Sequence, residues 1–470
     1  MWRAAWYGLA CGHKVVTRTD THVSELIEHE CTYVRFVIPS PRYLRLVKEG
    51  SWIVAGQIAV VLGALVLVRV LTEYLDPTQY GQLALGLTVA GLINQVVMGG
   101  VTAGIGRFYS VAAEKNDLPS YLHASRWLMV YATVAVVVIA LVLMAGLYWL
   151  SYSSWMGLAA VALLFSVLSG YNTLLSGIQN AARQRAIVAF HGGLDAWLKI
   201  LLAVGVMFWL GKSSSAVILG YAMSSLLVTG SQFYFLHRLI HPLGEMPQAS
   251  ANWVRQIWAY SWPFSTWGVF TWAQQVSDRW ALQTFASTQE VGMYAVLFQL
   301  GYVPIGLATG MAITFLGPVL YQRSGIATDH TRNTSVHRIA WRITFVGLLV
   351  TALAFVFTLM LHKWIFHLLV DTQYRTVSNF LPWMVLAGGI FAAGQMLALK
   401  LMSEMKPAAM TAAKIVTAIL GVALNVYGAK QYGLPGVVAA LVLFSGIYFF
   451  WMAWLAQHSP TSSSHHLRTL

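Results

Sequence analysis

Residues 69–84 read RVLTEYLDPTQYGQLA, and residues 279–295 read RWALQTFASTQEVGMYA. The two stretches align from Arg69 on Arg279 to Gly81 on Gly292, with one extra residue in the second copy. Each has an arginine near the end of an apolar run, a short polar turn containing Thr-Gln, and a Gly-x-x-Ala sequence that opens the next run. Self-similarity of this kind predicts two related halves, and chance similarity of two short stretches is the alternative.

Apolar runs on both sides of these stretches are long enough to span a bilayer, which takes about 20 residues for a hydrocarbon core of about 30 Å. Hydrophobic residues make up 58% of the 470 residues, charged residues only 10%, and the mean hydropathy is +0.64, which excludes soluble and disordered chains. Six runs separate the two copies, so the halves have the same orientation. The expected spans are 52–72, 81–103, 127–149, 154–177, 187–209, 215–238, 257–280, 291–320, 339–361, 379–400, 407–427 and 433–456. The eighth contains Pro304 and Pro318, which predict a kink or a break.

The distribution of basic residues tests this count through the positive-inside rule. With a cytoplasmic N-terminus, 21 of the 29 Lys and Arg fall in inner segments, 4 in outer loops and 4 within spans. Both chain ends are therefore expected in the cytoplasm. Topology and contact with anionic lipid account for the net charge of +13, so no nucleic-acid partner is expected.

The expected organisation is two lobes with polar segments around them. The first segment has no apolar core long enough for a signal peptide, and we interpret it as a disordered cytoplasmic extension. A basic segment lying on anionic lipid and a wrongly assigned start are the alternatives. The two cysteines, Cys11 and Cys31, both lie in it, so we expect neither a disulfide framework nor a metal site. The expected boundaries are 1–50 for the extension, 51–240 for the N-lobe, 241–256 for a cytoplasmic linker, 257–456 for the C-lobe and 457–470 for a cytoplasmic tail.

Three short motifs carry a family resemblance: LDPTQYGQLAL from Leu75, Asp278-Arg279 followed by VGMY from Val291, and YGLPGV from Tyr432. With the twelve spans they resemble the oligosaccharide flippases of the multidrug/oligosaccharidyl-lipid/polysaccharide exporter superfamily, and look most like its Wzx-type polysaccharide-biosynthesis branch. The resemblance covers about residues 51–456. It implies an all-α polytopic membrane protein with twelve transmembrane helices in two pseudo-symmetric six-helix lobes around a central cavity.

The same resemblance implies a function. A bacterial inner-membrane protein of this kind flips an undecaprenyl-diphosphate-linked oligosaccharide from the cytoplasmic to the periplasmic leaflet, for O-antigen, capsule or exopolysaccharide assembly. Its partners are the lipid-linked oligosaccharide, membrane lipids, and a polysaccharide polymerase with other assembly proteins. No HExxH, Walker A, GxSxG or CxxC motif is present, so we expect neither an enzyme nor a cofactor. A cation-coupled multidrug exporter of the same superfamily and a non-transporting component of polysaccharide assembly are the alternatives.

Charged residues within the spans are the candidate functional residues, because each costs about 2.5–3.5 kcal/mol at a helix centre unless it faces a partner or a cavity. Asp195 and Lys199 are four residues apart in the fifth span, which fits a cavity or a self-neutralised pair. Arg69 and Arg279 occupy equivalent places in the two copies, and extension of their side chains to the headgroups is the alternative to a role at the lobe interface. Lys414 is expected to reach the inner surface.

These charges predict the sign of the ligand. The four cations exceed the carboxylates Asp195 and Asp278 by two, which favours an anion such as a diphosphate. We predict that Arg69, Lys199 and Arg279 bind the diphosphate and that Asp195 and Asp278 serve gating or coupling. Trp267, Trp272 and Gln275 are predicted to contact sugar, and ordinary roles as membrane-interface anchors or helix–helix contacts are the alternatives.

Overall fold

The computed structural model describes residues 41–240, 251–324, 330–403 and 407–458. Residues Met1–Val47 and Lys48–Leu470 form separate units, and the description below concerns the second. The predicted extension lies largely outside the described residues, as do the tail and most of the predicted linker.

The described residues form helices and turns without a strand. Each of the twelve predicted spans lies within a helical segment, because long apolar runs can satisfy their backbone groups in a bilayer only as helices. The elements are α1 (Pro41–Tyr74), α2 (Pro77–Ile93), η1 (Asn94–Met98), α3 (Gly99–Glu114), α4 (Leu118–Trp149), η2 (Ser153–Trp155), α5 (Met156–Ala181), α6 (Arg185–Leu210), α7 (Ser214–Ile240), α8 (Ala251–Phe285), α9 (Thr288–Leu297), η4 (Phe298–Tyr302), α10 (Val303–Ser324), α11 (His330–Leu369), η5 (Thr372–Phe380), α12 (Leu381–Ser403) and α13 (Pro407–His458).

Ten continuous helical segments in the described part of the chain are long and apolar enough to cross a membrane. The polar and tryptophan-rich α8 is a further long helix outside this set, and α13 is two helices joined by a kink. Gly433 makes the kink with a φ of 60°, which glycine adopts without strain. The protein is thus an all-α polytopic membrane protein. We use the names N-lobe for α1–α7 and C-lobe for α8–α13, after the two halves predicted from the sequence.

Two π-helical turns interrupt the second and eighth spans. The first, η1, joins α2 to α3, and the second, η4, joins α9 to α10. The predicted interruption of the eighth span therefore takes the form of a π turn that ends at Tyr302, two residues before Pro304, which has no backbone N–H to donate to the preceding turn. π turns occur often at functional sites, and residues of both line the cavities described below.

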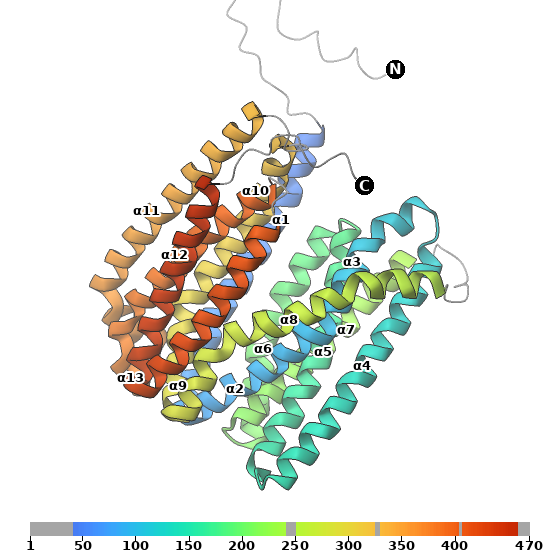
Figure 1. Cartoon of the computed structure of the whole chain (residues 1–470). Coiled ribbons are helices and arrows are strands. Elements are labelled where there is room, and N and C mark those ends of the chain that lie inside the picture. The colour runs from blue at the N-terminus through green and yellow to red at the C-terminus, as the bar shows by residue number, and fades with distance from the viewer. Residues whose placement is uncertain (1–40, 241–250, 325–329, 404–406, 459–470) are drawn as a thin grey trace, which may run out of the picture. The chain divides into compact units, whose positions relative to one another are not determined.

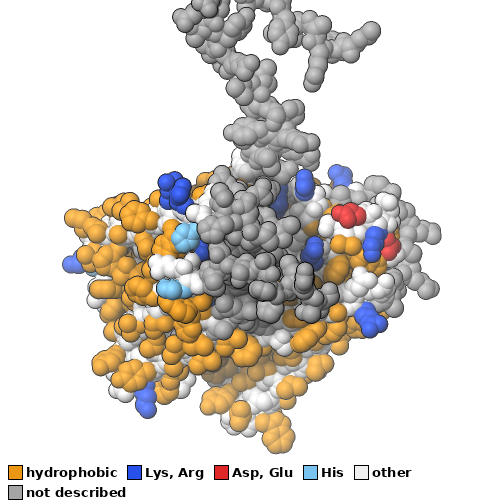
Figure 2. Space-filling view, turned by 45° about the horizontal axis from the view of Figure 1, so that its top comes forward, with side chains coloured by type: hydrophobic (Ala, Val, Ile, Leu, Met, Phe, Trp, Pro, Cys, Tyr) orange, Lys and Arg blue, Asp and Glu red, His pale blue; other side chains and the backbone are white. Residues whose placement is uncertain are grey.

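The outer surface of the helices is apolar. Figure 2 shows hydrophobic side chains over most of the described surface, with most of the Lys and Arg side chains in view towards one end. Trp209 is 90% exposed and Met360 is 79% exposed, which suits lipid and not water. Together with the ten apolar segments, this surface identifies a multi-pass membrane protein.

Helix α8 begins against the N-lobe and continues into the C-lobe (Figure 1). Near its start, the Trp253 indole N–H donates to the Asp117 carboxylate at 2.6 Å. The Ser120 hydroxyl and this indole lower the pKa of Asp117 below its ordinary value. Further along, added Cβ atoms on Gly100 and Gly104 of α3 would overlap serine hydroxyls of α8, so these glycines allow the two helices to lie in close contact. The second half of α8 packs on α13.

The two predicted repeats meet directly, where α2 packs along α9. A Cβ on Gly81 would overlap the Thr288 carbonyl oxygen, and a Cβ on Gly292 would overlap the Pro77 carbonyl oxygen. The glycine of each Gly-x-x-Ala sequence therefore allows the backbones of the two helices to touch. We call this end of the bundle, where α1 turns into α2 and α8 into α9, the turn end.

The turn end is also tied together by side chains at equivalent places in the repeats. Gln79, two residues before Gly81, accepts the backbone N–H of Ser214 at 2.9 Å at the start of α7. Glu290, two residues before Gly292, accepts the backbone N–H of Leu434 at 2.7 Å. Each side chain thus satisfies an unpaired N–H at the start of the last helix of its own lobe.

We expect Gly81→Ala and Gly292→Ala to destabilise the protein by about 1–3 kcal/mol, because neither backbone carbonyl can move aside without separating α2 from α9. The measurement is unfolding of purified protein by titration with sodium dodecyl sulfate. Gly205→Ala in α6 is the matched control, since its added Cβ meets nothing within 4 Å. Equal stability of all three variants would show that the close helix contact is unimportant.

Candidate functional site

A cavity of about 480 Å³ lies within the C-lobe, and we call it the C-lobe chamber. Its walls come from α8, η4, α10, α12 and α13. Many of the lining side chains are amides and aromatic rings, and a few are charged. The lining includes Gln274, Gln275, Asp278, Arg279, Phe298, Tyr302, Phe391, Gln395, Lys414, Thr417, Asn425, Phe444 and Tyr448.

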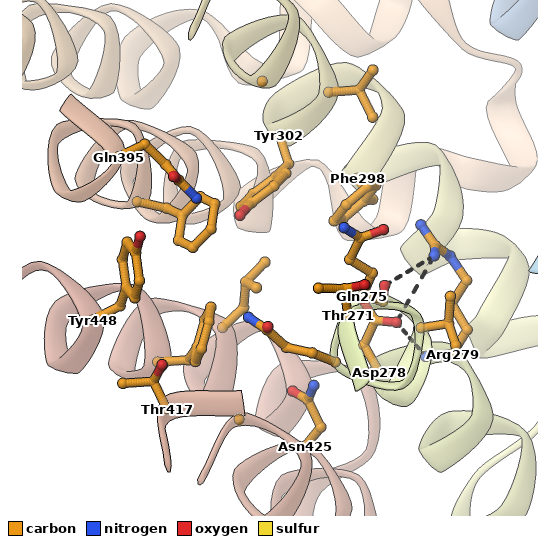
Figure 3. Close-up of a pocket in the computed structure, with 18 of the residues that line it drawn as sticks. Thr271, Gln275, Asp278, Arg279, Phe298, Tyr302, Gln395, Thr417, Asn425 and Tyr448 are labelled. Atoms are coloured by element: carbon orange, nitrogen blue, oxygen red, sulfur yellow. Dashed lines mark hydrogen bonds and ion pairs between the residues drawn. The ribbon is translucent and has the colours of Figure 1, made fainter. Parts of the chain in front are cut away.

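Figure 3 shows how these side chains surround the chamber: Gln395 and Tyr448 lie on one side, with Asp278 and Arg279 on the other. The aromatic rings lie close together, with centroids of Phe391 and Tyr448 4.8 Å apart. Flat apolar faces next to amides are the surroundings that a sugar ring needs, since a sugar has both C–H faces and hydroxyl edges.

A second cavity, of about 420 Å³, lies between N-lobe helices and α8, and we call it the N-lobe chamber. It contains one cation of the N-lobe, Lys199, together with amides of η1 and η4. The polar and aromatic lining comprises Tyr80, Thr88, Gln95, Phe165, Lys199, Tyr221, Trp272, Gln275, Arg279 and Gln299.

Three residues on one stretch of α8, Gln275, Val276 and Arg279, line both chambers. The Arg279 side chain is 15% exposed and its guanidinium lies 4.6 Å from the centre of the Phe298 ring. One of its nitrogens is 4.0 Å from the Asp278 carboxylate. A planar cation with several donors, placed where two polar cavities adjoin, suits a phosphate group that contacts both.

Asp278 is 4% exposed and already has partners of its own. The Tyr294 hydroxyl donates to one carboxylate oxygen at 2.6 Å, and the backbone N–H of Arg279 donates to the other at 2.7 Å. These bonds keep a buried carboxylate from being unsatisfied. Among the described residues, no group of three or more His, Cys, Asp and Glu side chains is placed to hold a metal ion.

Lys199 and Asp195 form an ion pair of 2.5 Å on α6. The second Asp195 oxygen accepts the Ser224 hydroxyl of α7 at 3.1 Å, and the ammonium of Lys199 lies 5.5 Å from the centre of the Phe165 ring. Both interpretations of the four-residue spacing therefore apply. Asp195 and Lys199 neutralise each other, and Lys199 also lines the N-lobe chamber.

Arg69 differs from its repeat partner. It is not among the residues that line either chamber, and its side chain, 39% exposed, lies 3.7 Å from Glu73 on the next turn of α1. The residue four places after Arg279 is Gln283, which offers no charge, so Arg279 pairs with Asp278 instead. The expectation that both arginines reach a common site at the lobe interface is thus not met by these two chambers.

Two of the three residues predicted to contact sugar line a chamber. Trp272 and Gln275 line the chambers, and the Trp272 indole N–H donates to the Thr88 carbonyl at 2.7 Å. Trp267 belongs to α8, but its side chain lies outside the described part of the structure. Tyr302 and Tyr448 were not predicted from the sequence, because aromatic residues are common in membrane helices and their direction depends on helix rotation.

Lys414, which was expected to reach the inner surface, lines the C-lobe chamber. Lys414, Thr417, Gly421 and Asn425 all line it, at spacings of three, four and four residues. This spacing places them on one face of the first half of α13. The polar positions in an otherwise apolar helix were a usable signal for the chamber.

Solved transporter structures share the fold of this chain. The structure described as "Lipid II flippase MurJ, inward closed conformation" aligns over 87% of this chain and 87% of its own, with a TM-score of 0.65 and 10% identity. An outward-facing multidrug resistance MATE family transporter of the MOP superfamily aligns over 88% of this chain and 97% of its own, with a TM-score of 0.55 and 16% identity. A MOP-superfamily transporter from Pyrococcus furiosus Vc1, described as having a binding pocket of reverse polarity, aligns over 87% and 96%, with a TM-score of 0.55 and 15% identity. The fold is that of MOP-superfamily transporters.

Residues 46–324 match the family model described as "Polysaccharide biosynthesis protein". The match covers more than half of the chain, and the chain belongs to this family. No curated protein matches the sequence.

We expect Tyr294→Phe to lower the free energy of unfolding by roughly 1.5–3 kcal/mol, because it removes a donor from the buried Asp278 carboxylate. Detergent-titration unfolding of the purified protein measures the change. Tyr448→Phe is the control, since the Tyr448 hydroxyl is buried and has no hydrogen-bond partner in the described part of the chain, so its removal breaks no bond seen there. Similar losses in both variants would contradict the assignment of the Tyr294–Asp278 bond as a stabilising contact.

Proposed function

We propose that the protein flips a polyprenyl-diphosphate-linked oligosaccharide across the bacterial inner membrane, from the cytoplasmic to the periplasmic leaflet, for assembly of O-antigen, capsule or exopolysaccharide. The observation that carries this proposal is the position of Arg279, which lines two adjoining chambers within an apolar helical bundle, each with polar side chains in its lining. Membership of the polysaccharide biosynthesis family and a fold shared with a lipid II flippase support it.

In this proposal the diphosphate binds to Arg279, with Lys199 of the N-lobe chamber as a second cation. Each of these cations has a carboxylate beside it, Asp278 for Arg279 and Asp195 for Lys199, which keeps the empty site close to neutral. An arriving diphosphate competes with these carboxylates for the cations, and this competition couples binding to a change in contacts within α6 and α8. Asp195 and Asp278 would then act in gating.

The sugars occupy the C-lobe chamber, where amides and aromatic rings predominate, and the polyprenyl tail remains in the lipid. The two lobes move relative to each other and expose the chambers alternately, the turn end facing the periplasm and the chain ends the cytoplasm. The movement to the outward state requires separation of α2 and α9 at Gly81 and Gly292. Membrane lipids are immediate neighbours, and a polysaccharide polymerase is the expected receiver of the product.

A cation-coupled multidrug exporter is the second candidate, because multidrug MATE transporters share the fold. Its site would use the buried Asp278 carboxylate for an organic cation. Arg279 directly beside Asp278 opposes this, since it places a positive charge where the drug's charge would lie. Transport of ethidium by proteoliposomes without movement of lipid-linked sugar would favour the exporter.

The test uses purified protein in liposomes and a polyprenyl-diphosphate-linked neutral disaccharide with a fluorophore on the sugar. Dithionite, which does not cross the membrane, destroys the label in the outer leaflet. We expect protein to make the inner-leaflet label accessible, and we expect Arg279→Gln to slow this roughly ten- to a hundredfold by loss of a charged hydrogen bond.

Lys363→Gln, at an exposed cation of α11, is the control for the loss of one positive charge. Arg69→Gln should lower the rate less than Arg279→Gln, because Arg69 pairs with Glu73 outside both chambers. No movement of labelled lipid by the wild-type protein, in liposomes where a known flippase is active, would refute the proposed function and favour a non-transporting role.

A further inference from the structure

The C-lobe chamber contains a cation that the proposed diphosphate site does not use. Lys414 is half-buried on the chamber-facing side of α13, three residues from Thr417 and eleven from Asn425. Lys199 and Arg279 both have a carboxylate within 4.0 Å, and no such ion pair is found for Lys414 in the described part of the chain. Lys414 therefore gives the C-lobe chamber an unbalanced positive charge.

Two further groups in the same chamber have no partner among the described residues. These are the Asn425 side-chain oxygen and the Tyr448 hydroxyl, which are buried in residues that are 6% and 2% exposed. The amide nitrogen of Asn425 already donates to the Ser277 hydroxyl at 2.9 Å, which fixes the side chain with its oxygen free. Buried polar atoms in native proteins are nearly always paired, so these atoms indicate that a polar ligand belongs here.

The free groups together specify that ligand. The Lys414 ammonium binds an anionic group, and the Asn425 amide oxygen accepts a hydrogen bond from a hydroxyl. The Tyr448 hydroxyl can donate a hydrogen bond to an anionic group or accept one from a hydroxyl. Phe391, whose ring centroid is 4.8 Å from that of Tyr448 and 5.8 Å from that of Phe444, supplies an apolar face beside them. A ring with hydroxyls, an apolar face and a negative charge is an acidic sugar.

Competition from the other charge in the chamber is small. Asp278 also lines it, but its oxygens accept from Tyr294 and from the Arg279 backbone, and the Arg279 guanidinium lies beside it. While no diphosphate is bound to Arg279, the negative charge of Asp278 is therefore balanced locally, and the net charge offered to a ligand is that of Lys414. The chamber volume of about 480 Å³ falls within the range of about 300–1,000 Å³ usual for ligand sites.

We propose that the C-lobe chamber binds an oligosaccharide that contains a negatively charged sugar residue, such as a uronate, with the anionic group on Lys414 and hydroxyls of the oligosaccharide on Asn425 and Tyr448. This inference rests on the proposed function and names the class of oligosaccharide that is carried. The polysaccharide assembled from it is acidic. Lys414 determines the preference, whereas Arg279 holds the diphosphate common to all lipid-linked sugars.

The experiment measures binding of two soluble probes to the purified full-length protein in nanodiscs by isothermal titration. One probe is the disaccharide glucuronyl-N-acetylglucosamine, and the other is its neutral carboxyl-reduced form, glucosyl-N-acetylglucosamine. The wild-type protein binds the acidic probe about tenfold or more tightly than the neutral one, as a charge-assisted hydrogen bond provides. Lys414→Gln abolishes this preference, because it weakens binding of the acidic probe far more than binding of the neutral one.

Two cation variants, a hydroxyl variant and a competitor separate recognition of the sugar's charge from a general change in binding. Lys414→Arg keeps the preference because it keeps the charge, and Lys430→Gln, at an exposed cation of the same helix, leaves both affinities unchanged. Tyr448→Phe weakens both probes, since its hydroxyl serves the sugar and not the charge alone. Inorganic pyrophosphate is the competitor: if its binding, and not that of the acidic probe, depends on Lys414, then Lys414 serves the diphosphate and the inference is overturned.

Equal affinity of the wild-type protein for the two probes overturns the inference, as does an equal loss of both in Lys414→Gln. The probes carry neither lipid nor diphosphate, so the result is independent of the flipping assay. Flipping of the neutral lipid-linked disaccharide without a preference for the acidic probe refutes only the acidic sugar. A Lys414-dependent preference without any flipping refutes only the proposed transport.

Discussion

Charges within apolar helices limit how this bundle can pack. Each such charge costs about 2.5–3.5 kcal/mol at a helix centre unless it has a partner or a polar space to face. Lys199 meets the requirement with Asp195, and Arg279 with Asp278 and the face of Phe298. Both cations also line chambers, as does Lys414. The helices that carry them must leave polar space between them, and the two chambers are that space.

The close contact of α2 and α9 decides how the chambers meet. Because Gly81 and Gly292 bring two backbones into contact at the turn end, residues of α9 and η4 reach the N-lobe chamber beside Tyr80 and Lys199. The same short repeat also contacts the last helix of each lobe. Gln79 and Glu290, each two residues before the glycine, accept a backbone N–H from that helix. One local sequence pattern, used twice, thus joins the lobes to each other and organises each lobe internally.

The apolar runs predicted the helices well, because a bilayer allows a long apolar segment no other structure. The Gly-x-x-Ala repeat predicted that Gly81 and Gly292 occupy equivalent positions in the two halves. In the structure, the helices that carry them are in contact at these glycines. The directions of side chains were harder to predict. Equivalent places in the repeat suggested equivalent roles for Arg69 and Arg279. Arg69, however, forms an ion pair with Glu73, whereas the equivalent residue near Arg279 is the uncharged Gln283. The place of Lys414 in the chamber lining was not predicted, because hydropathy gives its depth in the membrane but not the rotation of α13.

The two lobes are related in fold but differ in chemistry. Lys199 of the N-lobe chamber is paired with a carboxylate on its own helix. The C-lobe chamber has an aromatic wall and, in Lys414, a cation that forms no ion pair with the described residues. A lipid-linked sugar is equally asymmetric, with its diphosphate between a polar head and a greasy tail. Helix α8 contributes Gln275, Val276 and Arg279 to both chambers, and it packs on α3 of one lobe and α13 of the other. A ligand bound to Arg279 is therefore in contact with both lobes. When one lobe moves relative to the other, the surroundings of the diphosphate change. The sugar meanwhile keeps its contacts within the C-lobe.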